Sequence, residues 1–259
     1  MNIIVLAKQT FDTEEKIVIE QGTISEDGVK FVLNPYDEYA VEQAIQLRDE
    51  HGGKVTVIAI GPERAAEALR TALAMGADDA VLIDDQGAAL DEHAVAQILH
   101  AHVSQQAYDL ILGGNFSVDN GSGQVAIRLA KLLGIPHVGS ITKLVIQDGH
   151  AEVERDAEGD TERLTAALPA LFTAQQGLNE PRYPSLQGIM KAKRKPFQQL
   201  SLADFDSPSI VSASQEPLTA RVAVFTPPPR QAGKRLSGTP SEQAQQLIEL
   251  LQTEAKLFT

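Results

Sequence analysis

Residues 54–83 read KVTVIAIGPERAAEALRTALAMGADDAVLI, and the architecture of the chain follows from them. Two continuous apolar runs, residues 55–60 and 80–83, enclose a segment of helical period that begins at Pro62 and ends at Gly76. Continuous Val, Ile and Leu runs of this length are typical of strands that are buried on both faces. We therefore expect a strand, a helix and a second, parallel strand, joined by a right-handed crossover.

The same alternation extends to both sides of this unit. Apolar runs at residues 3–6 and 109–112 predict two more buried strands. Asn34 followed by Pro35 predicts a capped helix start. Helices are expected to begin near Pro35, Pro62, Asp91 and Ser122. These elements predict an α/β fold of three layers, with a mostly parallel sheet covered by helices on both faces.

After Pro136 the period changes. Residues 141–168 alternate apolar and polar side chains across turn signals at residues 148–149 and 158–160. Alternation of this kind predicts antiparallel strands, which we expect to be added to the same sheet.

The C-terminal part of the chain has a different composition. From about residue 200 it is rich in Pro, Ser and Gly, with one expected strand at residues 220–225, and Thr239 begins a capping box before a final helix. The apolar face of that helix consists of Ala244, Leu247, Ile248, Leu251 and Ala255. We therefore divide the chain into an α/β nucleotide-binding domain, residues 1–199, and an extended arm, residues 200–259. The helix of the arm must dock on this chain or on a partner subunit.

The composition narrows the possible functions. The 259 residues carry 22 Lys and Arg against 35 Asp and Glu, a formal net charge of −13, and no cysteine. Such a chain is repelled by nucleic acid and by anionic lipid, and its apolar runs are shorter than the roughly 20 residues that cross a bilayer. The lack of cysteine excludes disulfides and fits a reducing compartment. Because the N-terminal residues enter an apolar strand without a preceding basic region, we expect a cytoplasmic protein.

Residues 112–124, LGGNFSVDNGSGQ, lead from a buried strand into a helix through several glycines. Glycines allow close backbone approach, and the N–H groups at a helix start attract anions, so the segment predicts a phosphate site. The alternative is an ordinary glycine-rich turn. The six histidines have no metal-binding spacing, and the sequence contains no G-x-S-x-G nucleophile motif. We therefore expect a binding protein without catalytic residues of its own and without a metal.

A second segment is basic within this acidic chain. Residues 189–196, IMKAKRKP, follow NEPRYPSL at residues 179–186. The prolines restrict the backbone and leave Leu186 between an aromatic residue and a run of cations. We interpret the segment as a docking loop with one apolar anchor and positive charges for an acidic partner. The alternative is a solvated basic turn.

At these residues the sequence resembles the β subunit of electron transfer flavoproteins over nearly its whole length. The resemblance is carried by Val153-Glu154-Arg155, Leu168-Pro169-Ala170, Thr173-Ala174, Asn179-Glu180-Pro181-Arg182-Tyr183 and Ile189-Met190-Lys191-Ala192-Lys193. Further matches are Asn34-Pro35-Tyr36, the run at residues 70–78, and Pro228-Pro229 with Arg230, Ala232 and Gly233.

The resemblance implies a role in electron transport. Such β subunits form a heterodimer with an α subunit that holds the redox-active FAD. The heterodimer takes electrons from acyl-CoA dehydrogenases of fatty acid oxidation, or from related dehydrogenases, and passes them to a membrane quinone oxidoreductase. The β chain binds AMP, which is structural, and its C-terminal arm packs on the α subunit.

The resemblance also implies site residues. The AMP contacts would be Leu6, Asn34, Pro35, Tyr36, Asp37, Ile60, Gly114, Asp119, Asn120, Gly121, Ser122, Gly123, Gln124 and Val125. Tyr36 lies where the family places an aromatic side chain near the flavin of the α subunit. The partner-docking loop would comprise Arg182, Tyr183, Pro184, Ser185, Leu186, Gln187, Gly188, Ile189, Met190 and Lys191, with Leu186 as its apolar anchor.

Two alternatives stay open beside this interpretation. Residues 119–123, DNGSG, replace an acidic run that is common in the family, and one bifurcating branch binds a second FAD where other members bind AMP. A free-standing adenine-nucleotide-binding regulator on a similar α/β layer would need no α subunit. An adenylating enzyme is disfavoured, because residues 7–10, AKQT, replace the Ser/Gly-rich pyrophosphate loop after the first strand.

Overall fold

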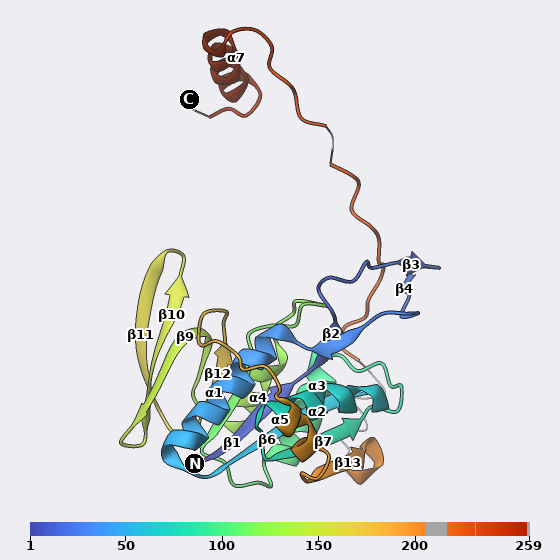
Figure 1. Cartoon of the computed structure of the whole chain (residues 1–259), viewed down its shortest axis with the longest axis vertical. Helices are drawn as coiled ribbons and strands as arrows, with labels where there is room; N and C mark the ends of the chain where they lie inside the picture. Colours follow the sequence, from blue (N-terminus) through green and yellow to red (C-terminus); the bar gives the residue numbers. More distant parts are fainter. Residues whose placement is uncertain (206–216, 231, 258–259) are drawn as a thin grey trace. The chain divides into compact units, whose positions relative to one another are not determined.

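The parallel sheet expected from the sequence forms the centre of the computed structural model, which describes residues 1–205, 217–230 and 232–257 (Figure 1). In sheet order, the nine strands are β11 (Asp160–Ala167), β10 (His150–Ala157), β9 (His137–Gln147), β12 (Ala170–Ala174), β8 (Leu110–Gly114), β1 (Asn2–Ala7), β6 (Lys54–Gly61), β7 (Asp79–Asp84) and β13 (Phe197–Ser201). From β9 to β13 in this order, all neighbouring strands are parallel. Strands β10 and β11 are antiparallel additions at one edge. The predicted mostly parallel sheet with added antiparallel strands is therefore confirmed.

The strand order reverses direction next to β1. From β1 the chain moves to β6 and β7 on one side, and then to β8 on the other side. In open α/β sheets, the carboxyl ends of the strands separate at such a reversal and leave room for a ligand. The topology alone therefore points to the ends of β1, β6 and β8 as the place for a site.

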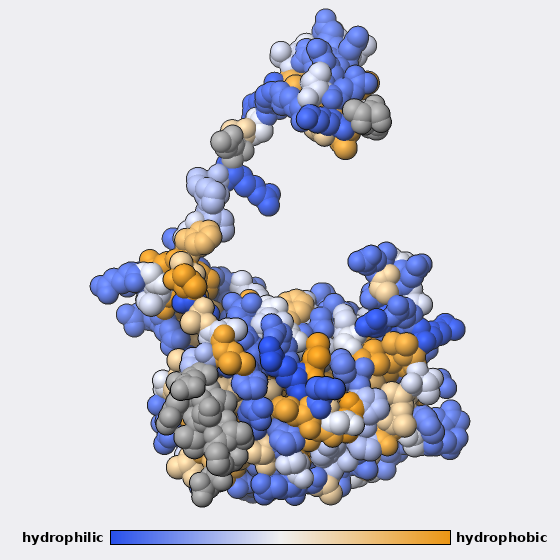
Figure 2. Space-filling view, turned by 180° about the vertical axis from the view of Figure 1, so that it is seen from behind, coloured by the Kyte–Doolittle hydropathy of each residue, from blue (hydrophilic) through white to orange (hydrophobic). Residues whose placement is uncertain are grey.

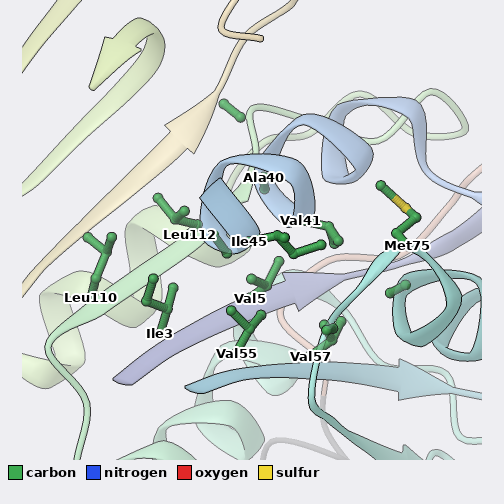
Figure 3. Packing of buried hydrophobic residues seen from close by; sticks show 14 of the residues in the cluster. Ile3, Val5, Ala40, Val41, Ile45, Val55, Val57, Met75, Leu110 and Leu112 are labelled. Carbon is green, nitrogen blue, oxygen red and sulfur yellow. The ribbon is translucent and has the colours of Figure 1, made fainter. Parts of the chain in front are cut away.

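Helices cover both faces of the sheet, as expected. They are α1 (Pro35–His51), α2 (Ala66–Met75), α3 (Glu92–Val103), α4 (Val125–Leu133) and α5 (Leu186–Ala192), with 3₁₀ turns η1 (Glu63–Ala65) and η2 (Leu202–Asp204). Buried side chains of α1, α2 and α5 form one apolar cluster with the sheet, and those of α3 and α4 form another on the opposite face. Figure 3 shows the first cluster, in which Val41 and Ile45 of α1 lie against Ile3 and Val5 of β1.

Two helices begin differently from the prediction. The helix expected from Pro62 opens with the 3₁₀ turn η1 before α2 begins. The helix expected near Ser122 begins only at Val125, because Gly121 and Gly123 have φ angles of +69° and +59°, which an α-helix cannot contain.

The sequence did not predict strands β12 and β13, nor four shorter ones. The shorter strands are β2 (Gln9–Phe11), β3 (Ile19–Glu20), β4 (Thr23–Ile24) and β5 (Phe31–Leu33), which form two small two-stranded sheets, β2 with β5 and β3 with β4. Strands of two or three residues leave no detectable period in a sequence.

The capped C-terminal helix is confirmed as α7 (Pro240–Thr253), although the predicted face residue Ala255 lies beyond its end. Thr239 and Glu242 form the predicted reciprocal capping box. The strand expected at residues 220–225 is wrong: this segment has no strand structure, and Val222 is 96% exposed. An isolated apolar alternation cannot become a strand without a neighbour that accepts its backbone hydrogen bonds.

The described chain divides into two compact units, residues 1–18 with 24–222 and residues 19–23 with 223–259. The strand β13 runs across residue 199, where the sequence suggested a domain boundary. Residues 206–216 and 231 of the predicted arm lie outside the described residues. None of the helices in the described ranges combines the length and apolar character that crossing a bilayer requires.

Candidate functional site

A cavity of about 350 Å³ opens where the strand order reverses. Its wall includes the carboxyl ends of β1, β6 and β8, the loop at residues 114–124, and the first residues of α3 and α4. The glycine-rich segment therefore lines the cavity that the topology predicts.

Most of the predicted nucleotide contacts lie in this wall. They are Leu6, Asn34, Asp37, Ile60, Gly114, Asp119, Asn120, Ser122, Gly123, Gln124 and Val125. The wall does not include Pro35, Tyr36 or Gly121, which are themselves among the described residues. The ring of Tyr36 instead packs against Phe116, with ring centroids 4.2 Å apart. Tyr36 thus supports the loop from beside the cavity.

Two glycines let the backbone approach closely at this site. A Cβ on Gly123 would lie 2.8 Å from the carbonyl oxygen of Asn115, and the φ angle of +59° is itself unfavourable for other residues. A Cβ on Gly114 would overlap the Oδ1 atom of Asp37 and lie 2.8 Å from the Tyr36 backbone. This part of the wall is therefore shaped by main chain, and a side chain at either position would push the loop away from the segments that it contacts.

The N-terminal end of α1 holds the loop through two polar side chains. Asn34 occupies the predicted N-cap position but does not cap the helix. Its Nδ2 donates to the Phe116 carbonyl (3.0 Å), and its Oδ1 accepts from the Val118 N–H (3.2 Å). The sequence identified the residue correctly as a cap position and missed that its side chain fastens the loop instead.

Asp37 joins the ends of β1 and β8. Its carboxylate accepts from the backbone N–H of Lys8 (2.7 Å) and of Gly114 (2.9 Å), and the residue is only 5% exposed. Burial raises the pKa of Asp37 to about 7, although these hydrogen bonds and one from Asn34 oppose the shift. The carboxyl group is therefore a structural connection between two strands that also titrates near neutral pH.

An ion pair lies across the wall between the first strand and the loop. Lys8 Nζ is 2.8 Å from Asp119 Oδ2 and also donates to Ser117 Oγ at 3.3 Å. Burial would raise the pKa of Asp119, but the charge and hydrogen bond of Lys8 outweigh it and lower the pKa. The carboxylate is thus ionised and oriented by Lys8.

The opposite wall carries further polar groups. Asp91 Oδ1 caps α3 by accepting from the Ala94 N–H (2.9 Å), and its Oδ2 accepts from the N–H groups of Leu218 (2.8 Å) and Thr219 (3.0 Å). Arg64 donates to Gln9 (2.7 Å), and its guanidinium carbon lies 3.8 Å from the centre of the Phe31 ring. These contacts fasten the segments that surround the cavity.

Sequence reasoning missed several residues of this wall, namely Lys8, Arg64, Asp85, Asp91 and Glu92. Lys8 could have been found, because it directly follows the first parallel strand and carboxyl ends of such strands collect ligands. The other four residues could not be identified from the sequence, because their positions relative to the loop depend on the fold.

The cavity combines an apolar part with a polar end. Leu6, Ile58, Ile60, Val95 and Leu99 supply apolar wall, while loop 114–124 and the start of α4 supply backbone amides. Such a wall suits a flat apolar ring with an attached anion. In the part of the chain that the structure describes, no cluster of His, Asp and Glu has the arrangement of a metal site.

Only residues 182–185 of the predicted docking loop are loop, because residues 186–191 belong to helix α5; the segment is largely exposed. Tyr183 is 95% exposed, Leu186 82% and Met190 69%, and the Ser185 side chain caps α5 by accepting from the Gly188 N–H at 3.0 Å. Lys195 is an exception within the basic run. Its Nζ donates to the carbonyl oxygens of Leu73 (2.9 Å) and Ala77 (2.5 Å) at the end of α2, so this cation is used inside the fold.

Comparison with known proteins gives consistent matches. A family model described as "Electron transfer flavoprotein domain" matches residues 21–205. The electron transfer flavoprotein subunit beta of Bacillus subtilis is 54% identical over 260 residues, which cover 100% of both chains. That of Syntrophomonas wolfei is 39% identical over 259 residues, covering 99% of this chain and 98% of the relative. The caffeyl-CoA reductase-Etf complex subunit CarD of Acetobacterium woodii is 37% identical over 244 residues, covering 92% and 93%.

Proposed function

Because this chain belongs to the electron transfer flavoprotein family, as one of its β subunits, we propose that it binds AMP as a structural ligand and supports the α subunit. The α subunit mainly holds the FAD, which supplies the electron-carrying chemistry when bound. The heterodimer accepts electrons from acyl-CoA or related dehydrogenases and passes them to a quinone oxidoreductase. The chain itself carries no catalytic residues in this proposal.

The observation that carries the AMP proposal is the cavity at the strand-order reversal. Apolar side chains such as Leu6 and Ile60 fit an adenine ring, and the backbone amides of the loop and of the start of α4 fit a phosphate. The close approach of Gly123 to the Asn115 backbone fixes the shape of the loop whose amides would face the ligand.

The cavity volume is compatible with a mononucleotide. A volume of about 350 Å³ lies near the lower end of the roughly 300–1,000 Å³ that ligand pockets span. FAD carries a flavin half in addition to its adenylate half and would need space beyond this wall. AMP is therefore the ligand of this proposal, and the number of FAD molecules per heterodimer distinguishes it from the bifurcating branch.

Exposed apolar side chains support the proposal of an α-subunit partner. In the main body they include Ile127 and Leu132 of α4, Val145 of β9 and Leu164 of β11, and apolar patches are visible on the rear of that body in Figure 2. In the C-terminal arm they include Val222, Phe225, Leu247 and Ile248. Surfaces of this kind mark protein interfaces when they gather into patches. We propose that the arm, residues 200–259, packs on the α subunit.

The loop at residues 182–191 is proposed to dock the dehydrogenase. Leu186 and Tyr183 are the exposed apolar and aromatic groups, and Lys191 adds positive charge to the same segment. Anchors that fill a pocket of the partner supply most of an interface's affinity, and nearby charges steer the encounter. The name of the Acetobacterium woodii relative connects that protein with a caffeyl-CoA reductase complex, which supports a partner that acts on CoA thioesters.

The proposal is tested by co-expression with the α subunit encoded in the same host. We expect a yellow heterodimer with one FAD, which an acyl-CoA dehydrogenase reduces in the presence of its acyl-CoA substrate and which a quinone oxidoreductase reoxidises. Two FAD per heterodimer would indicate the bifurcating branch. A stable β chain that binds adenine nucleotide but never associates with the α subunit would favour a free-standing regulator.

A further inference from the structure

A buried carboxylate on α1 contacts the beginning of the docking loop. Glu42 is 3% exposed, and its Oε2 accepts from the Nε (2.7 Å) and the backbone N–H (3.2 Å) of Arg182. Its Oε1 accepts from the Nη2 of Arg182 (2.9 Å) and from Gln46 Nε2 (2.8 Å). The guanidinium is therefore bound by both carboxylate oxygens, which is the most specific geometry for an Arg–carboxylate pair.

Both members of this pair are ionised. Burial would raise the pKa of Glu42, but hydrogen bonds from Arg182 and Gln46 outweigh it and lower the pKa. Hydrogen bonding to Glu42 raises the pKa of Arg182, against the effect of burial. A buried carboxylate without its partner is strongly unfavourable, so the fold is most stable when Arg182 occupies this one position.

A second contact joins the same face of α1 to the same segment. Asn179 Nδ2 donates to the Tyr39 carbonyl (3.0 Å) and to Gln43 Oε1 (3.3 Å). Residues 39, 42, 43 and 46 are spaced three and four apart, so they lie on one face of the helix. The chain is thus fastened to α1 at Asn179 and at Arg182, directly before the exposed part of the loop begins.

The other end of the loop is fastened to α2. A Cβ on Gly188 would overlap the Ala74 carbonyl oxygen, so α5 lies directly against the end of α2, and Lys195 donates to Leu73 and Ala77 there. The segment between these attachments contains Tyr183 and Leu186, which are 95% and 82% exposed. A short exposed segment between two fixed points is preorganised for binding.

We propose that Glu42 is a positioning residue for dehydrogenase docking: by binding Arg182 with both carboxylate oxygens, it holds the loop so that Leu186 is presented to the partner. This inference rests on the docking function proposed above. Glu42 itself is too deeply buried to contact a dehydrogenase, so it acts only through Arg182. Arg182 also lies 4.0 Å from Asp49, which is too far to replace the bidentate contact.

The test compares Glu42→Gln with Glu50→Gln in the complete heterodimer. Glu50 is exposed near the end of the same helix, so its substitution removes the same charge without touching the loop. Two quantities are measured for each variant: the hydrogen exchange of peptides covering residues 179–192, and the KM for the heterodimer in its reduction by an acyl-CoA dehydrogenase.

For Glu42→Gln we expect faster exchange in these peptides and a KM increase of about tenfold, with kcat and FAD content close to the parent values. Glu50→Gln should change neither quantity. In the double variant Glu42→Gln/Arg182→Gln, the KM should rise no further than in Glu42→Gln alone, because both substitutions remove the same contact. Arg182→Lys should give an intermediate KM, since lysine keeps the charge but cannot bind both oxygens at once.

Unchanged exchange of residues 179–192 in Glu42→Gln would overturn the positioning role, whatever the KM. Faster exchange with an unchanged KM and a lowered Tm would also overturn it, because Glu42 would then only stabilise the fold. Leu186→Ala, measured in parallel, separates this inference from the docking proposal: if that variant also kept its KM, docking by the loop would be wrong, and hydrogen exchange would still decide whether Glu42 holds the loop.

Discussion

The proposed nucleotide cavity and the proposed docking loop are built in opposite ways. The cavity is shaped by backbone amides, glycines and buried side chains such as Asp37, which is 5% exposed. The docking loop presents Tyr183 and Leu186, which are 95% and 82% exposed and contribute little to the core. In this proposal, recognition of the ligand is inseparable from the fold, whereas recognition of a partner depends on side chains that can change while the fold stays intact.

The substitution Gly123→Val gives the largest expected effect. The valine Cβ would lie 2.8 Å from the Asn115 carbonyl oxygen, and the φ angle of +59° is unfavourable for valine, so the loop must move. We expect the folded protein to lose roughly 1–3 kcal/mol of stability. We expect loss of bound adenine nucleotide, together with a lower Tm, in the purified heterodimer. Nucleotide content is measured by chromatography of the denatured protein. A normal AMP content in this variant would mean that the segment is only a turn.

Asp37→Asn tests the connection between β1 and β8. An amide has one acceptor and one donor, so either the Lys8 or the Gly114 N–H would face an N–H₂ group, at a cost of about 1–3 kcal/mol. We expect a clearly lower Tm and weaker nucleotide retention. A Tm equal to that of the parent protein would show that the carboxylate is dispensable for joining the strands.

The raised pKa of Asp37 predicts a pH dependence with a definite sign. The folded protein keeps this proton up to about pH 7, whereas the unfolded chain loses it near the ordinary value of 3.8. Its contribution to stability is present at low pH and is lost as the pH rises through about 7, by at most about 1.4 kcal/mol per pH unit. The Tm difference between parent and Asp37→Asn should therefore shrink from about pH 5 to about pH 8. A difference that widens over this range would contradict the assignment.

Leu186→Ala is the matching test on the exposed side. Because the side chain is 82% exposed, its loss should leave the Tm nearly unchanged. As an interface anchor it should still contribute about 2 kcal/mol to docking, so the KM for the heterodimer should rise by more than tenfold with the acyl-CoA dehydrogenase as electron donor. Equal KM values for variant and parent would remove the loop from the docking surface.

Lys8→Gln has the smallest expected effect. The Lys8 and Asp119 side chains are 41% and 21% exposed, so solvent screens their ion pair, which contributes about 0.2–1 kcal/mol. We expect nucleotide affinity to fall only a few-fold, as measured by isothermal titration of the nucleotide-depleted heterodimer. A complete loss of binding would assign Lys8 a direct contact with the phosphate.

The sequence predicted those features that depend on local pattern. The parallel strands, the antiparallel addition and the capped C-terminal helix follow from apolar periods and capping residues, and the structure confirms them. Asn34 and Gly123 were identified for local reasons, a helix start and a glycine-rich turn, and both lie in the cavity wall.

Features that depend on distant contacts could not be predicted in this way. The Asn34 side chain binds residues more than 80 positions away, and Glu42 binds Arg182 across 140 positions. The sequence assigned Lys195 to the basic run of the docking segment, because nothing in the sequence places the end of α2 beside it. The expected strand at residues 220–225 failed for the related reason that strand formation needs a neighbouring edge.

The most direct test counts the nucleotides released from the intact heterodimer after purification from its host. Mass spectrometry of the denatured protein should find one AMP and one FAD for each pair of α and β subunits. A heterodimer that carries its FAD but releases no adenylate would contradict the claim that main-chain amides at the strand-order reversal bind this ligand.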